Sequence, residues 1–188
     1  MKTWLLAAMA AISVMLSPAA FAIDVGPPVG TRIPAFTARD AQGAAVQWSD
    51  IAGEKGTVLV FFRSAKWCPF CQAQLISLKD AAAPLQQRGY RLTAISYDAP
   101  EVLADFTKRR DIPYTLLSDD KSVMIDAFKL RDPQYKPDSM AFGVPQPSIF
   151  VISRAGLIQA KLAEEGYKMR PPVEVVLKAV DGVLAGTN

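Results

Sequence analysis

The sequence predicts an α/β domain in which helices flank a central mixed sheet. An apolar run at Val58–Phe62, rich in branched and aromatic residues, is typical of a strand buried on both faces. A helical stretch and a second apolar strand, Tyr90–Ser96, follow it, which indicates a βαβ unit with parallel strands. Two further strands, expected at Ser148–Ser153 and Leu157–Leu162, pair antiparallel across a tight turn before a last amphipathic helix that begins at Pro171.

Local signals predict the remaining elements. The segments Ala35–Ala38 and Ala45–Trp48 flank a turn that contains glycine, which predicts an N-terminal β-hairpin. The helix after the first central strand is expected over Gln72–Gln87, with apolar residues on one face. Asp98 and Glu101 have the spacing of a capping box, so Asp98 is predicted as the N-cap of the next helix. We also expect a strand at Tyr114–Leu117, a helix at Lys121–Leu130 and a loop at Leu130–Val144.

The first 22 residues have the pattern of a secretory signal peptide. Lys2 supplies a positive start, Trp4–Leu16 is apolar, and Ala20-Phe-Ala22 is a small-residue cleavage site. The apolar run is too short to span ~30 Å of hydrocarbon. We therefore expect a cleaved leader over residues 1–22, no membrane anchor after cleavage, and one folded domain over residues 23–188. Export implies an oxidising compartment, and we predict the bacterial periplasm.

Composition excludes several function classes. The net charge of +3 is too small to indicate binding to nucleic acid or to an anionic membrane. The chain has no histidine, which excludes Ser-His-Asp and Cys-His catalysis as well as histidine-ligated metals. Its two cysteines supply only half of a tetrahedral zinc site. We therefore predict neither a metal nor a cofactor.

The two cysteines, Cys68 and Cys71, form a C-x-x-C pair at the predicted strand-to-helix turn. Pro69 suits the first helical position, where no backbone N–H partner is needed. A helix N-terminus stabilises the thiolate, the reactive form of cysteine. We predict a redox-active disulfide in which Cys68 is the exposed nucleophile and Cys71 resolves the mixed disulfide. Lys66 would add positive potential, and Trp67 would pack beside the sulfur as part of a docking surface.

A static structural disulfide, a pair of inert thiols and a metal-handling site are the alternatives. A bridge that closes a four-residue loop removes only about 2 kcal/mol of unfolded-state entropy, about half of what a long-range bridge removes. The pair is therefore poorly placed to stabilise the fold, and redox chemistry is the preferred interpretation.

The segment Trp67-Cys-Pro-Phe-Cys71 after an apolar strand resembles the thioredoxin superfamily. The preceding Phe-Phe-Arg-Ser-Ala-Lys and the segment Gly30–Gly43 resemble its peroxiredoxin-like branch, the alkyl hydroperoxide reductase/thiol-specific antioxidant, or redoxin, group. The resemblance covers nearly all of the chain after residue 22. It implies a thioredoxin-like fold in which the segment from about Asp98 to Leu130 is the central insertion of the peroxiredoxin-like members.

The resemblance also implies a cis-proline that faces the redox turn. Pro145 and Pro147 are the candidates, and Pro147 fits better because the strand begins directly after it. A cis bond there would leave the backbone of Gln146 free to pair with a bound substrate chain. An ordinary trans proline at the first residue of a strand is the alternative.

Two enzyme hypotheses follow from the resemblance. In the favoured one, the protein is a thiol-disulfide oxidoreductase that acts on protein disulfides or dithiols, with a membrane partner as an electron donor. In the other, it is a thiol peroxidase that reduces hydroperoxides, with Cys71 at the peroxidatic position. Two residues argue against the peroxidase hypothesis. Cys68 stands where that family usually has a threonine, and Pro147 stands where it has the arginine that would polarise the peroxide. Arg63 is the candidate substitute for that arginine. A redox-inactive binding module of the same fold is the third hypothesis.

Overall fold

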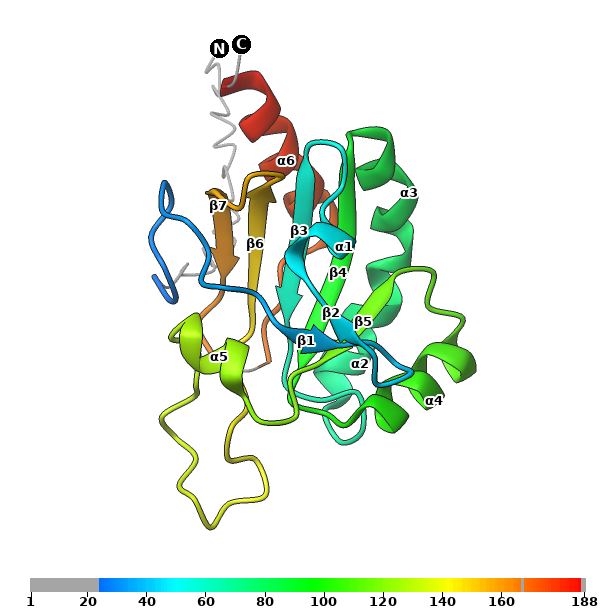
Figure 1. Ribbon diagram of the computed structural model, residues 1–188, viewed down its shortest axis with the longest axis vertical. Helices are drawn as coiled ribbons and strands as arrows, with labels where there is room; N and C mark the ends of the chain where they lie inside the picture. Colours follow the sequence, from blue (N-terminus) through cyan, green and yellow to red (C-terminus); the bar gives the residue numbers. More distant parts are fainter. Residues whose placement is uncertain (1–23, 167, 187–188) are drawn as a thin grey trace, which may run out of the picture.

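The computed structural model describes residues 24–166 and 168–186, so the predicted leader over residues 1–22 lies outside the described part of the chain. Within that part, seven strands form one mixed sheet in the order β2-β1-β5-β4-β3-β6-β7 (Figure 1). In chain order the elements are β1 (Ala38–Arg39), β2 (Ala45–Val46), α1 (Trp48–Ile51), β3 (Gly56–Phe61), α2 (Pro69–Ser77), α3 (Lys79–Gln87), β4 (Tyr90–Ser96), α4 (Pro100–Arg110), β5 (Thr115–Ser118), α5 (Val123–Ala127), β6 (Ser148–Ser153), β7 (Ile158–Ala163) and α6 (Val173–Gly186).

The strand β3 lies at the centre of the fold. It pairs in parallel with β4 on one side and antiparallel with β6 on the other. Every residue of β3 is buried, which explains why its sequence is apolar without alternation. The parallel pairs β3–β4 and β4–β5 and the antiparallel pair β6–β7 confirm the predicted mixed sheet with flanking helices.

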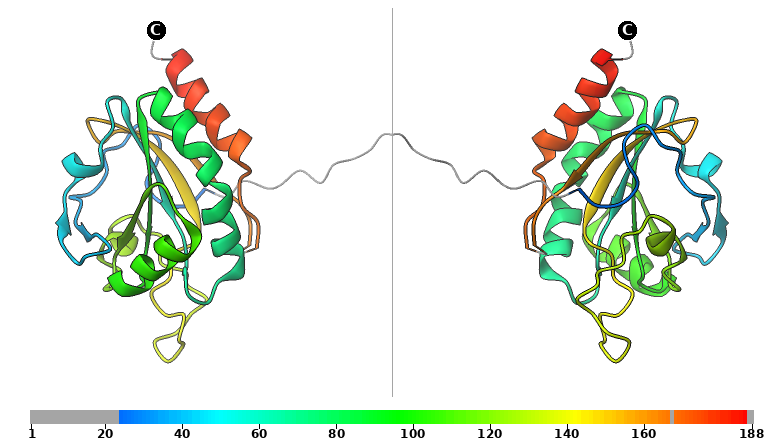
Figure 2. Two further views of the ribbon diagram at one scale, coloured as in Figure 1. Left: turned by 90° about the vertical axis from the view of Figure 1, so that its right-hand side faces the viewer. Right: turned by 90° about the vertical axis from the view of Figure 1, so that its left-hand side faces the viewer.

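Two apolar clusters cover the opposite faces of the sheet. Val58 and Val60 point to one face, where they pack with side chains of α2, α3, α4 and α6. Leu59 and Phe61 point to the other face, with side chains of α1 and α5. This division follows from the alternation of side chains along a strand. Figure 2 shows α3 and α6 side by side on the first face.

Most predicted elements are present, with changed ends. The N-terminal hairpin is confirmed, with Ala38 opposite Val46 in the register of β1 and β2. The single helix expected over Gln72–Gln87 is instead two helices, α2 and α3, that meet at Leu78. The predicted helix at Lys121–Leu130 is reduced to the short α5.

The predicted capping role of Asp98 is wrong. The N-cap of α4 is Ala99, and no side chain caps this helix. Instead, the Asp98 carboxylate accepts hydrogen bonds from the segment that precedes Cys68. A local D-x-x-E pattern predicts the cap, but bonds to a distant segment replace it.

The register of the sheet brings several connections to one edge. Phe61, the last residue of β3, lies opposite Ser148, the first residue of β6, and Ser148 lies opposite Ala163, the last residue of β7. The carboxyl ends of the parallel strands β3, β4 and β5 share that edge. The segments that follow β3, β4 and β7 therefore all emerge at the same end of the molecule, the lower end in Figure 1.

Candidate active site

The cysteine pair lies where the sequence predicts it, at the N-terminus of α2. Cys68 is the N-cap residue of this helix and Pro69 is its first helical residue. The Cys68 Sγ atom accepts a hydrogen bond from the backbone N–H of Cys71, with a distance of 3.2 Å. A backbone N–H in the first turn of the helix thus points at the Cys68 sulfur, as the stabilisation of a thiolate requires.

Cys68 and Cys71 form a disulfide bond, so the structure represents the oxidised protein. The expectation of an exposed Cys68 is wrong for this state, because Cys68 is only 2 % exposed and Cys71 is fully buried. Both residues belong to the apolar cluster that α2 and α6 share with β3. The predicted burial of Cys71 is confirmed, but the structure does not distinguish an exposed from a covered cysteine.

A guanidinium group that the sequence analysis missed contacts the disulfide. The Nη2 atom of Arg170 donates a hydrogen bond to Cys71 Sγ at 3.4 Å. Burial and the nearby charge of Arg63 lower the pKa of Arg170 to about 10, so its side chain is still a cation at neutral pH. An adjacent cation favours the charged form of a thiol. Arg170 is therefore placed where a cation would stabilise a thiolate on Cys71 in the reduced protein.

No local motif marks Arg170 as a site residue. It lies 99 residues after Cys71, in a segment that the sequence predicts only as a polar loop. The register of β3, β6 and β7 carries the chain back to the redox turn at Ala163, and the following residues then reach the disulfide. The position of Arg170 beside the disulfide therefore follows from the order of the strands and not from any local sequence pattern.

Arg63 is the second cation of the site. It is 3 % exposed, and its Cζ atom lies 5.2 Å from the ring centroid of Trp67 and 4.8 Å from that of Tyr135. Its Nη2 atom also donates a hydrogen bond to the Tyr135 hydroxyl. Because its charge lowers the pKa of Arg170, Arg63 acts on the same site. The two cations give the site a positive potential beside the sulfur pair.

Trp67 is half-buried beside the cysteine pair and joins it to the chain after β4. Its ring packs on the guanidinium of Arg63 and, edge to face, on the ring of Tyr97. Its Nε1–H donates a hydrogen bond to the Tyr97 hydroxyl at 2.9 Å, and that hydroxyl donates to the Met140 carbonyl. The indole is thus held in one orientation by a polar and an aromatic contact.

The cis bond predicted before Pro147 is absent. Every peptide bond among the described residues is trans, including the one before Pro147. The Gln146 N–H donates to the Leu130 carbonyl at 2.7 Å, and the Gln146 carbonyl accepts from the Ser148 hydroxyl. The N–H that we expected to pair with a substrate strand is thus bonded to the chain at Leu130. The backbone of Gln146 is therefore engaged within the protein.

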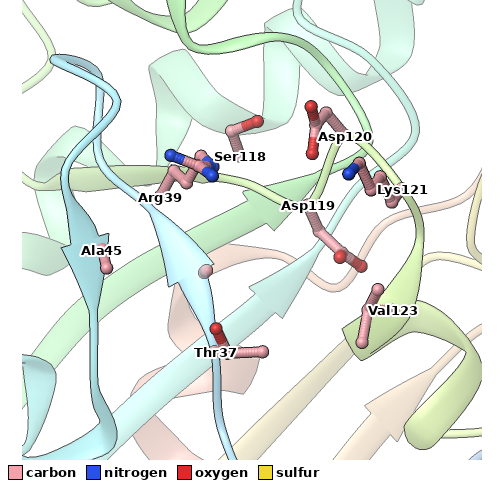
Figure 3. Close-up of a pocket in the computed structure, with 9 residues that line it drawn as sticks. Thr37, Arg39, Ala45, Ser118, Asp119, Asp120, Lys121 and Val123 are labelled. Atoms are coloured by element: carbon pink, nitrogen blue, oxygen red, sulfur yellow. The ribbon is translucent and has the colours of Figure 1, made fainter.

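A polar pocket of about 290 Å³ lies at the same sheet edge, but beside β1 and β5 (Figure 3). Asp119, which is buried, and Arg39 line it. In the strand order β4 lies between β5, which borders the pocket, and β3, which leads to the redox turn. Among residues 24–166 and 168–186, no three Cys, Asp or Glu side chains gather as a metal site.

The sequence matches the family model described as the AhpC/TSA family over residues 29–161. The chain belongs to the AhpC/TSA family of the thioredoxin superfamily. This confirms the resemblance inferred from the Trp67–Cys71 segment. The family is one of thiol peroxidases, so membership favours the second enzyme hypothesis over the first.

Individual relatives agree with this membership. The chain is 36 % identical over 100 residues to the peroxiredoxin-like protein bcp of Haemophilus influenzae, and the match covers 53 % of this chain and 63 % of that protein. It is 28 % identical over 130 residues to the chloroplastic peroxiredoxin Q of Sedum lineare, covering 69 % of this chain and 66 % of that one. The matches thus span under two-thirds of either relative's own length.

The fold is that of solved peroxiredoxins. A cysteine-to-serine mutant of peroxiredoxin 6 from Arenicola marina superposes with a TM-score of 0.77 at 16 % identity, covering 87 % of this chain and 76 % of that one. At this level of identity the likeness shows the fold alone. It confirms the predicted thioredoxin-like architecture.

The contact between Arg170 and Cys71 predicts a shift in thiol ionisation. In reduced protein that carries Cys68→Ser, Arg170→Gln should raise the midpoint pH of thiolate absorbance by about one unit, because an adjacent cation is lost. Arg109→Gln is the matched control, since Arg109 pairs with Asp105 on the exposed face of α4. A midpoint that is the same with and without Arg170 would show that this contact does not act on the thiolate.

Proposed function

We propose that the protein is a thiol peroxidase in which Cys71 attacks the hydroperoxide and Cys68 resolves the product. The observation that carries this proposal is the hydrogen bond from Arg170 to Cys71 Sγ, at the sulfur that is also bonded to Cys68. Membership in the AhpC/TSA family supports it, as does the resemblance noted in the sequence, which implies the peroxidatic position for Cys71. Hydroperoxides are the proposed substrates, and a thiol reductant is the proposed partner.

The proposed cycle has three steps. The Cys71 thiol gives up its proton to solvent, and the thiolate attacks one peroxide oxygen. The O–O bond breaks, Cys71 becomes a sulfenic acid, and the other oxygen takes up a proton from solvent and leaves as an alcohol or water. The Cys68 thiol then attacks the Cys71 sulfur, which forms the disulfide and releases water. Two thiols of a reductant finally reduce the disulfide and become oxidised to a disulfide themselves. The bonded sulfurs of the present structure correspond to the state before this last step.

Cys68 and Pro147, the two residues that depart from the family pattern, argue less strongly against peroxidase activity when the other residues of the site are considered. Cys68 replaces the usual threonine, and its thiol is then the resolving group, one helical turn from Cys71. Pro147 replaces the usual arginine, and Arg170 with Arg63 supplies positive charge from other segments. Developing negative charge on the leaving oxygen is stabilised by such fixed cations in a buried site.

Disulfide exchange with a protein dithiol or disulfide is the second candidate. In that function Cys68 is the nucleophile and Cys71 resolves, with a protein or a membrane electron donor as the partner. The hydrogen bond from the Cys71 N–H to Cys68 Sγ favours it, because it stabilises a thiolate on Cys68 as well. The same exchange chemistry is also the last step of the peroxidase cycle. The third hypothesis, a redox-inactive binding module, does not explain why the guanidinium of Arg170 contacts the Cys71 sulfur.

Single-cysteine variants separate the two candidates. With hydrogen peroxide and a dithiol reductant, Cys71→Ser should reduce peroxide consumption to the rate of a free cysteine. Cys68→Ser should still be oxidised rapidly in a single turnover, because Cys71 keeps its cation, but it should recycle slowly. Both are followed by stopped-flow peroxide consumption. If the wild-type protein consumes peroxide no faster than a free cysteine, and Cys71→Ser accumulates a mixed disulfide through Cys68 with a client protein, the exchange function is correct.

We also propose that the protein is exported to the periplasm. The charged start, apolar stretch and A-x-A site of residues 1–22 support this. Among the described residues, no helix is both long and apolar enough to cross a membrane. N-terminal sequencing of protein from a periplasmic extract should begin at Ile23; protein that retains Met1 or stays in the cytoplasmic fraction would contradict export.

A further inference from the structure

The buried carboxylate of Asp98 lies directly after β4, beside the segment that leads from β3 to Cys68. Its Oδ1 atom accepts a hydrogen bond from the Ser64 hydroxyl at 2.7 Å, and its Oδ2 atom accepts one from the Ala65 N–H at 2.7 Å. The Ser96 hydroxyl donates a third bond to Oδ2 at 3.0 Å. One carboxylate thus joins the end of β4 to the redox turn.

Ser64 extends this connection toward the cysteine pair. Its hydroxyl oxygen accepts the N–H of Lys66 at 2.9 Å and that of Trp67 at 3.3 Å. From the other side, the Gln72 side chain in α2 donates to the carbonyls of Ala65 and Lys66. The backbone N–H groups of the three residues before Cys68 therefore all donate to the side chain of Asp98 or of Ser64.

We propose that Asp98 is a positioning residue of the redox couple: through Ser64 and Ala65 it holds the turn in the conformation that keeps Cys68 within bonding reach of Cys71. Asp98 itself does not touch the sulfurs in this role. The proposal requires only that the pair cycles between dithiol and disulfide, which is common to both functions considered above.

Burial of the Asp98 carboxylate is unfavourable, and its hydrogen bonds together with the charge of Lys66 offset that cost. The residue is 6 % exposed, and burial raises the pKa of its carboxyl group, while the bonds from Ala65, Ser64 and Ser96 lower it. A buried carboxylate is unfavourable unless its oxygens are hydrogen-bonded. Bonds to an ionised acceptor are also shorter and stronger than neutral ones. An ionised carboxylate at this point therefore holds the turn more firmly than a neutral acceptor would.

The two sulfurs depend differently on this network. Cys71 lies within α2, whose Leu75 is fully buried in the apolar cluster that covers β3, so its place is set by packing. Cys68 lies before the helix, and its place depends on the turn that Asp98 and Ser64 hold. A preordered partner raises the effective concentration of one thiol at the other. Without the network, Cys68 samples other positions and the disulfide becomes less favourable.

The test compares Asp98→Asn and Ser64→Ala with wild type in glutathione redox buffers that contain no peroxide. Both variants should lower the equilibrium constant for closing the Cys68–Cys71 disulfide about tenfold, the lower end of what a hydrogen bond to a charged group contributes. Tenfold corresponds to about 30 mV for this two-electron couple. The rate of disulfide closure after oxidation should fall in both variants as well.

Asp119→Asn is the matched control. Asp119 is 5 % exposed, follows β5 as Asp98 follows β4, and accepts the Ile125 N–H at 2.8 Å. Burial raises the pKa of both carboxyl groups. The control should therefore lose stability in the same way while its disulfide equilibrium stays at the wild-type value.

Three outcomes would overturn the proposal. Wild-type equilibrium constants in Asp98→Asn and Ser64→Ala would show that the network does not position Cys68. A change in Asp98→Asn alone would show that the carboxylate acts through its charge. An equal change in Asp119→Asn would show a general loss of stability. If Asp98→Asn does not fold, Ser64→Ala with the Asp119 control decides the question, and a missing peroxidase activity has no bearing on either result.

Discussion

The guanidinium of Arg170 lies against the sulfur of Cys71, and the chemistry of the site depends on that contact. A thiol reacts as its thiolate, and in a buried site the thiolate forms only if positive charge or hydrogen-bond donors compensate for lost water. Cys71 is fully buried, so the helix N-terminus and a neighbouring cation have to supply that compensation. The fold satisfies this requirement by bringing the chain after β7 back to the end of β3.

The same contact connects the two functions that a C-x-x-C pair suggests. A cation beside Cys71 favours attack by this sulfur on a peroxide, and it equally favours Cys71 as the leaving group when an external thiolate attacks Cys68. Peroxide reduction and disulfide exchange then become the oxidising and the reducing halves of one cycle. Phe70, which lies between the two cysteines in the chain, is 39 % exposed, whereas both sulfur-bearing residues are buried.

The fold could be predicted from the sequence because its signals are local. The apolar run at β3, the matching strand β4 and the position of Pro69 at the start of α2 are visible in any short window. The assembly of the site could not be predicted in the same way. Arg170 reaches Cys71 only through the register of three strands, and no nearby residue indicates it.

Two errors show how tertiary contacts override local patterns. Asp98 has the spacing of a helix cap, yet its carboxylate turns to the Ser64 hydroxyl and the Ala65 N–H, where a buried charge gains stronger partners. Gln146 was expected to pair with a substrate chain, but the backbone at Leu130 already takes its N–H. In both cases a residue from another segment of the chain forms a hydrogen bond with the group for which we had predicted a different partner.

The identity of the sulfur that first receives oxygen tests the proposed cycle most directly. Reduced protein carrying Cys68→Ser can be mixed with one equivalent of hydroperoxide in the presence of a reagent that traps sulfenic acids, and the modified peptide identified by mass spectrometry. We predict rapid, complete labelling at Cys71, slowed when Arg170 is also replaced by glutamine. A Cys71 that remains unlabelled while the peroxide persists would contradict the proposal.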